Sequence, residues 1–148
     1  MRVLPSLRQS FGFVIAWLFF TLTGITVCSQ FNMAEISNMG IVISLSERLQ
    51  TTAQDVMGMA PLFGAIFGLG LLIAMIVASL VARFLPLLQT AIFVGAGLIA
   101  IAATLTTMKA TFAITAIAAT RDWDGFLSLC VLGGLAAYVY NKIARTER

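Results

Sequence analysis

The sequence contains no histidine and very little charge of either sign. Its 148 residues include nine Lys and Arg and six Asp and Glu, so that 10% is charged while 60% is hydrophobic. The mean hydropathy is +1.01. So few polar side chains cannot cover a surface exposed to water. The composition therefore argues against a soluble globular domain, a disordered chain or a nucleic-acid-binding protein.

The absence of histidine also narrows the chemistry. Histidine is the commonest metal and haem ligand and the usual acid–base group near neutral pH. The glycine-containing stretch GAIFGLG at 64–70 lies inside an apolar run with no Lys after it, so it is not a phosphate loop. We therefore expect a non-catalytic protein with no cofactor and no metal site.

What the sequence does contain is long neutral stretches. Residues 9–34, 56–82, 84–108 and 125–141 carry no charge, and a membrane helix needs about 20 mostly apolar residues. The sequence predicts an all-α integral membrane protein, a four-transmembrane-helix bundle forming a single domain over residues 1–148. The predicted spans are about 10–29, 60–83, 87–108 and 124–142, with outer loops at 30–59 and 109–123.

The first neutral stretch has a rival interpretation as a cleaved signal peptide. Arg2 and Arg8 precede it, as basic residues precede a signal sequence. However, the apolar run is too long for a typical signal, and no A-x-A-like cleavage site follows it. We therefore interpret residues 10–29 as a retained span.

The distribution of charge predicts the orientation. Six Lys and Arg fall at the termini and in the turn between spans 2 and 3, against three in the other two loops, which hold five of the six acids. Basic residues favour the cytoplasmic side. Both termini are therefore expected in the cytoplasm, in a bacterial inner membrane.

The connections carry helix signals of their own. Pro86 favours a tight turn between spans 2 and 3. Ser44 and Glu47 have the spacing of a capping box, and apolar residues then recur from Leu45, which predicts a short amphipathic outer helix between spans 1 and 2. Pro61 would bend the chain after it. The alternative is one long kinked helix from Leu45 to Arg83.

The loop between spans 3 and 4 contains ten uncharged residues, TFAITAIAAT at 111–120. Ten residues are too few to cross a membrane. An extension of span 3 or a packed loop is the simpler interpretation, and a re-entrant segment lining a pathway is the alternative.

Span 2 carries small residues on one face. Small residues allow membrane helices to pack closely. One interpretation is that the small residues of span 2 close the bundle. The other is that they dock another protein or a second copy, and both can hold at once. The predicted face consists of Ala60, Gly64, Gly68, Gly70, Ala74, Ala78 and Ala82.

The two cysteines, Cys28 and Cys130, lie at similar depths near the outer side of spans 1 and 4. A disulfide between them is one interpretation, and two buried apolar residues is the other, because no C-x-x-C motif is present.

Two functions are compatible with this inventory. The first is an accessory or structural subunit that packs against a larger membrane complex, with membrane lipid, other subunits or a second copy as partners. The alternative is a small oligomeric carrier or channel for a neutral or lipidic solute. In the alternative, the path would be lined by Thr104, Thr106, Thr107, Thr111 and Thr115.

Overall fold

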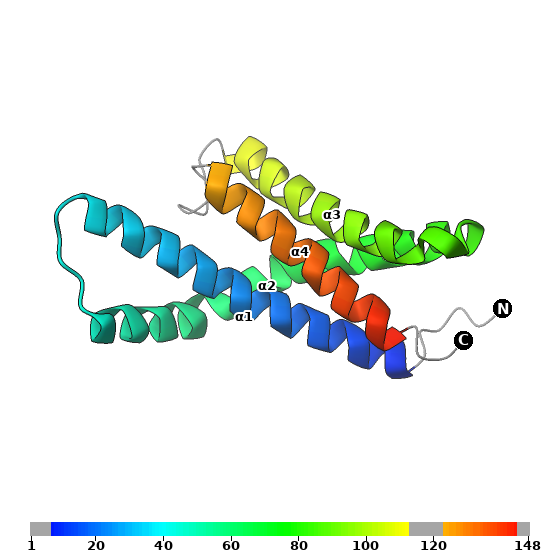
Figure 1. Cartoon of the computed structure of the whole chain (residues 1–148), viewed down its shortest axis with the longest axis horizontal. Coiled ribbons are helices and arrows are strands. Elements are labelled where there is room, and N and C mark those ends of the chain that lie inside the picture. The colour runs from blue at the N-terminus through cyan, green and yellow to red at the C-terminus, as the bar shows by residue number, and fades with distance from the viewer. Residues whose placement is uncertain (1–6, 113–122, 145–148) are drawn as a thin grey trace.

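The computed structural model describes residues 7–112 and 123–144, which form four long α-helices (Figure 1). These are α1 (Leu7–Asn38), α2 (Leu45–Phe84), α3 (Gln89–Phe112) and α4 (Trp123–Ala144), with a 3-10 turn, η1 (Pro86–Leu88), between α2 and α3. The described residues contain no strand. The predicted all-α class is confirmed for this part of the chain, whereas the segment 113–122 of the predicted 3–4 loop lies outside the described residues.

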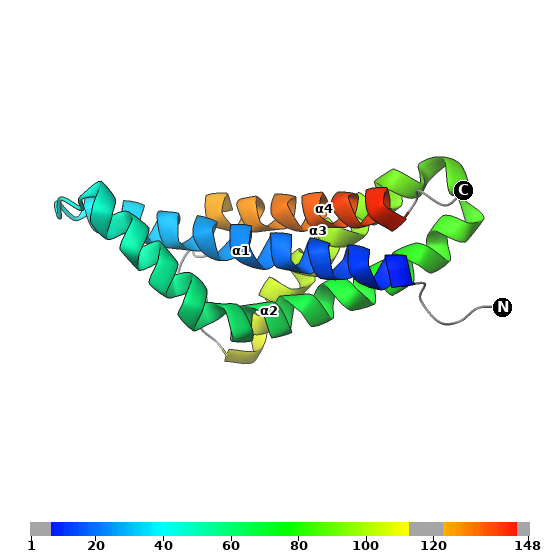
Figure 2. The ribbon, with the colours of Figure 1, turned by 90° about the horizontal axis from the view of Figure 1, so that it is seen from below.

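The helices pack in a ring in which each has two main neighbours. Both α1 and α3 contact α2 and α4, whereas no Cα atoms of α1 and α3 lie within 8 Å of each other in the described ranges. In Figures 1 and 2, α1 and α4 run antiparallel side by side, and α2 crosses α1. The start of α1, the α2–α3 turn and the end of α4 lie at one end of the bundle (Figure 1).

All four helices are long and apolar enough to cross a membrane. The shortest, α4, has 22 residues, which corresponds to about 33 Å against a hydrocarbon core of roughly 30 Å. The first two are much longer, with 32 residues in α1 and 40 in α2. Figure 1 shows the C-terminal end of α1 and the N-terminal end of α2 projecting beyond α3 and α4.

The predicted outer loop 30–59 is almost entirely helical. Only residues 39–44 lie outside α1 and α2. The prediction ended the first span at about residue 29, but a helix continues past the membrane boundary when its backbone bonds stay intact. Gly40 makes the turn after α1 at φ +87°, a conformation that costs glycine little because it has no Cβ.

The capping box at the start of α2 is confirmed, but the predicted short separate helix is wrong. The Ser44 hydroxyl accepts from the Glu47 backbone N–H, and the Glu47 carboxylate accepts from the Ser44 N–H at 2.8 Å. The helix that begins there runs without a break to Phe84, with Pro61 inside it. The alternative of one long helix from Leu45 is therefore what the structure shows.

Pro61 bends α2 without ending it. Proline has no N–H to donate to the carbonyl four residues earlier, here that of Met57, and its ring crowds that carbonyl. Figure 2 shows α2 changing direction along its length. We call the part before the proline, Leu45–Ala60, the α2 arm. The bonds of the flanking turns hold the helix together across this defect.

Aromatic rings and close backbone contacts form the core. Phe20 of α1 packs against Phe63 and Phe67 of α2, with ring centroids 5.9 and 5.6 Å away. On the other side, α3 and α4 approach each other closely at Gly97 and Gly133. A Cβ on Gly97 would collide with the carbonyl oxygen of Gly133, so these two helices meet backbone to backbone.

Candidate functional site

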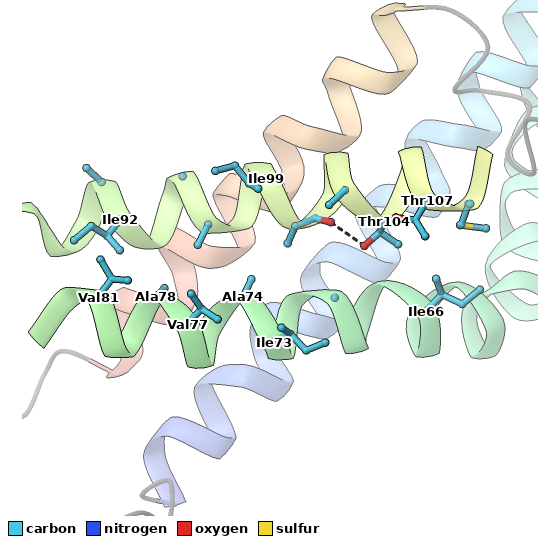
Figure 3. A pocket seen from close by; sticks show the side chains of 17 residues that line it. Ile66, Ile73, Ala74, Val77, Ala78, Val81, Ile92, Ile99, Thr104 and Thr107 are labelled. Carbon is cyan, nitrogen blue, oxygen red and sulfur yellow. Dashed lines mark hydrogen bonds between the residues drawn. The ribbon is translucent and has the colours of Figure 1, made fainter. Parts of the chain in front are cut away.

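An apolar groove of about 770 Å³ runs between α2 and α3 (Figure 3). Its floor consists of small residues from both helices: Gly70, Ala74 and Ala78 of α2, and Ala96 and Ala100 of α3. The exposed aliphatic side chains at its edges show that the groove opens sideways, away from the core. Ile73 and Val77 border it from α2, and Ile99 borders it from α3.

The two ends of the groove differ in character. Val81 and Ile92 lie at the end near the α2–α3 turn, and Ile66 and Thr107 lie at the other end (Figure 3). Only Thr104 and Thr107 bring side-chain oxygen to the lining. The Thr104 hydroxyl donates to the carbonyl oxygen of Ala100 at 2.8 Å. The lining contains no ionisable group, so the groove suits an apolar occupant.

The close approach of α2 and α3 depends on Gly70. A Cβ at this position would lie 2.7 Å from the Thr104 hydroxyl oxygen. Gly95, by contrast, also lines the groove but has open space where its Cβ would stand. The groove is therefore narrow at Gly70 and hollow at Gly95.

The structure distributes the predicted small-residue face of α2 over several contacts. Trp17 of α1 lies over Gly64 and Gly68, and its indole N–H donates to the Gly64 carbonyl at 2.7 Å. Gly64, Gly68, Ala78 and Ala82 are buried, and Ala60, Gly70 and Ala74 are half-buried. Much of this face therefore closes the bundle. Only Gly70, Ala74 and Ala78 also belong to the groove, and docking of a partner there stays a prediction.

Both cysteines are buried, and both thiols are free in the structure. Cys28 belongs to the core cluster on α1, and Cys130 belongs to the same cluster on α4. The simpler of the two interpretations, two buried apolar side chains, describes their present surroundings. A disulfide between them stays a prediction.

Of the threonines proposed to line a solute path, Thr104 and Thr107 line the groove, and Thr106 and Thr111 are not among its lining residues. The Thr106 hydroxyl donates to the Ala102 carbonyl of its own helix, and Thr111 donates in the same way to Thr107. Thr115 lies outside the described residues. No continuous threonine-lined path is visible in the described part of the chain.

A second surface, the hairpin tip, lies at the projecting ends of α1 and α2. It carries five large apolar side chains that are exposed: Met39, Ile41, Val42, Leu45 and Leu49. Val42 is 94% exposed. Glu35 and Asp55 flank the tip in the sequence, so it lies beyond the uncharged part of both helices.

Polar contacts hold the α2 arm against α1 below this tip. The Thr52 hydroxyl lies 3.2 Å from that of Ser29 and accepts from the Gln30 amide at 3.1 Å. The predicted apolar side of the arm, at Leu45, Leu49, Ala53, Val56 and Met57, is mostly exposed, with Val56 half-buried. The arm thus presents apolar side chains on the side that α1 does not cover.

A buried polar cluster at the other end of the bundle was missed by the sequence analysis. Asn141 of α4 is 2% exposed; its amide nitrogen donates to Thr90 and its oxygen accepts from Gln89, both at 3.2 Å. The cluster ties the end of α4 to the start of α3. Its sequence signal is weak, because Asn141 stands beside Lys142 and looks like part of a solvated helix end.

No three His, Cys, Asp or Glu side chains gather into a metal site within residues 7–112 and 123–144.

Comparison with protein-family models, with curated proteins and with solved structures finds no match to this chain.

Proposed function

We propose that this protein is a non-catalytic accessory subunit of a larger assembly in a bacterial inner membrane, with both termini in the cytoplasm. The hairpin tip is the surface that docks the partner. The partner presents a complementary apolar surface on the outer side of the membrane.

The exposure of the hairpin tip carries this proposal. A soluble surface rarely leaves several large apolar side chains exposed together unless they bind something. Here five of them gather at a helical hairpin, between Glu35 and Asp55 in the sequence. The Ser29–Thr52 contact joins the two helices below the tip, so it holds the helices that carry this surface together. Such a surface serves assembly without needing any reactive group.

Purification from the native membrane in a mild detergent tests the proposal. A tagged wild-type chain is expected to co-purify with a partner, and chemical cross-links are expected to map to the tip. A double variant, Val42→Asp with Leu45→Asp, places two carboxylates on the docking surface. It is expected to lose the partner while keeping its helix content and membrane insertion.

Gln50→Asp is the matched control, because Gln50 is an exposed polar residue on the same arm. This variant should retain the partner. The proposal fails if the wild-type chain purifies as a solitary monomer. It fails equally if the double variant keeps the same co-purifying protein as the control.

The groove gives one reason to keep the carrier as a second candidate. An apolar, side-opening groove at membrane depth could admit a neutral or lipidic solute. Purified protein in liposomes should then move such a solute faster than empty vesicles do. Equal flux in the two preparations would exclude the carrier function.

A further inference from the structure

We propose that the α2–α3 turn lies in the headgroup layer of the membrane, where its apolar side chains reach into the hydrocarbon and Arg83 pairs with anionic headgroups. The occupant of this surface is therefore the bilayer itself. The inference rests on the membrane placement in the proposed function, but it does not depend on partner docking at the hairpin tip.

The turn carries four exposed large apolar side chains: Phe84, Leu85, Leu87 and Leu88. Leu87 is 100% exposed and Phe84 is 85% exposed. Figures 1 and 2 show the turn reaching past the start of α1 and the end of α4, so neither of these helices shields it. Apolar side chains gathered in this way mark a surface that binds a partner or a membrane.

The length of α3 places the turn at the edge of the hydrocarbon. From Gln89, where α3 begins, to Lys109 in its last turn is about 30 Å along the helix, which equals the thickness of the hydrocarbon core. With Lys109 at one boundary of the core, Gln89 reaches the other. The three residues of η1 add about 6 Å, and each headgroup layer is roughly 5–8 Å thick. The turn therefore fits within that layer.

The end of α4 does not mark this boundary, because its uncharged stretch is shorter than the core. Residues 125–141 carry no charge and rise about 25 Å along a helix. Lys142 follows directly, and a long lysine side chain extends to the headgroups from below their level. The α2–α3 turn can thus reach further than α4 and still lie within the membrane.

Backbone polar groups keep the turn from lying deeper. The Leu88 N–H donates to the Leu85 carbonyl at 3.1 Å, but the last carbonyls of α2 lack partners within the helix. Hydrocarbon does not tolerate unpaired backbone groups, whereas water in the headgroup layer can bond them. Pro86 has no N–H, so it removes one such donor from the start of η1. The backbone and the apolar side chains therefore favour the same depth, at the boundary of the core.

Charge distinguishes this turn from the hairpin tip at the other end of α2. Glu35 and Asp55 separate the tip from the uncharged stretches, and anionic lipid repels carboxylates. By contrast, residues 56–108 contain no acid, and Arg83 is their one charge. Arg83 is exposed in the last turn of α2. A guanidinium pairs well with phosphate, and basic residues at a membrane surface attract anionic lipid. A second copy packed turn to turn would instead bring two Arg83 side chains together.

Nitroxide labels on the turn test this depth. Leu87→Cys and Phe84→Cys are each introduced into the full chain with both native cysteines replaced by serine, labelled, and reconstituted in vesicles of phosphatidylglycerol and phosphatidylcholine. Electron paramagnetic resonance then compares collisions with oxygen, which concentrates in lipid, and with a nickel chelate, which stays in water. Both labels are expected to collide more with oxygen than with nickel.

Val42→Cys is the matched control, because Val42 is also apolar and 94% exposed but belongs to the hairpin tip. Its label is expected to show the opposite order, with more nickel collisions. Arg83→Glu should shift the Leu87→Cys label toward nickel, because the headgroups repel a carboxylate, whereas Arg83→Lys should leave the order unchanged. Circular dichroism checks that each variant keeps its helix content.

An excess of nickel collisions at both turn labels would overturn the inference. Low collision rates with both reagents, together with broadening by a second label nearby, would show that another copy covers the turn, which also contradicts it. An Arg83→Glu label that stays at its original depth would remove Arg83 from the proposal.

Two further outcomes separate this inference from the proposed function. A chain that fails to float with the vesicles contradicts the membrane placement itself, and this inference with it. An excess of oxygen collisions at Val42→Cys as well as at the turn upholds the immersion of the turn and contradicts partner docking at the hairpin tip.

Discussion

At the scale of single residues, the indole N–H of Trp17 makes one of the hydrogen bonds that join α1 to α2. Trp17 donates to the carbonyl of Gly64, 47 residues away, and its ring lies where a side chain at Gly68 would have to go. The sequence showed both the tryptophan and the glycines. It could not show that they face each other, because this depends on the relative rotation of two helices.

Replacing Trp17 by phenylalanine keeps an aromatic ring but removes the donor. We expect Trp17→Phe to lower the free energy of unfolding by about 1 kcal/mol, the typical net contribution of one such hydrogen bond. Unfolding in a titration with a denaturing detergent, followed by circular dichroism, measures the change. Trp123→Phe is the control, because Trp123 is 78% exposed; equal losses in the two variants would contradict the role of Trp17.

The capping box gives a pH dependence at the start of α2. Hydrogen bonds from the Ser44 backbone N–H and then its hydroxyl stabilise the carboxylate and lower the pKa of Glu47 from 4.5. The cap is therefore fully formed above pH 4.5 and is lost as the pH falls through the lowered value in the folded protein. Hydrogen exchange at the first turn of α2 should accelerate over that range.

Ser44→Ala provides the control for this titration. The variant lacks the hydroxyl, so the pKa of Glu47 should move back toward 4.5, as followed by NMR of the carboxyl group. A Glu47 titration that is identical in Ser44→Ala and wild type would show that the hydroxyl contributes nothing to the lowered pKa of Glu47.

At the scale of the elements, the existence of the helices was predictable but their ends were not. Uncharged stretches of 17–27 residues identify four helices because membrane hydrocarbon excludes charge. The same signal says nothing about where a helix ends outside the membrane, so α1 continues to Asn38 and α2 begins at Leu45. Pro61 indicated a bend, but it left open whether two separate helices or one long kinked helix would contain it.

The bend in α2 can be tested directly. Pro61→Ala supplies the N–H that the carbonyl of Met57 lacks. With spin labels on Gln50→Cys and Leu80→Cys, in a background with both native cysteines replaced by serine, electron paramagnetic resonance should report a longer distance in the alanine variant. An unchanged distance would mean that contacts with α1, rather than the proline, set the bend.

The α3–α4 contact depends on two glycines that meet backbone to backbone. Gly97→Ala should lower the free energy of unfolding by about 3 kcal/mol, because a backbone carbonyl cannot move aside as a flexible side chain can. Gly95→Ala, two residues away with open space for its Cβ, is the control. It should leave stability unchanged or raise it by up to about 1 kcal/mol through helix propensity. The detergent titration measures both, and similar losses would contradict the close contact.

At the scale of the whole molecule, the candidate surfaces were less predictable than the architecture. The small residues of α2 were visible in the sequence, but their division between Trp17, the core and the groove depends on which helices lie on either side. The groove forms because small residues of two neighbouring helices, such as Ala74 of α2 and Ala100 of α3, line the same space. The exposed tip at Ile41 and Val42 likewise requires the helices to extend beyond the bundle.

The arrangement of the helix ends fits a chain that crosses the membrane four times. The α2–α3 turn and the end of α4 lie together at one end of the bundle, and the hairpin tip lies at the other (Figure 1). With basic residues in excess at the first end, that end should face the cytoplasm.

Labelling with a membrane-impermeant thiol reagent measures most directly on which side of the membrane each helix end lies. Single cysteines are placed at exposed positions, Gln50, Leu87 and Lys142, in the background without native cysteines. In intact cells we predict that only Gln50→Cys reacts, and that Leu87→Cys and Lys142→Cys react once the membrane is permeabilised. Reaction of Gln50→Cys and Leu87→Cys from the same side would show that α2 does not cross the bilayer and would contradict the four-span account.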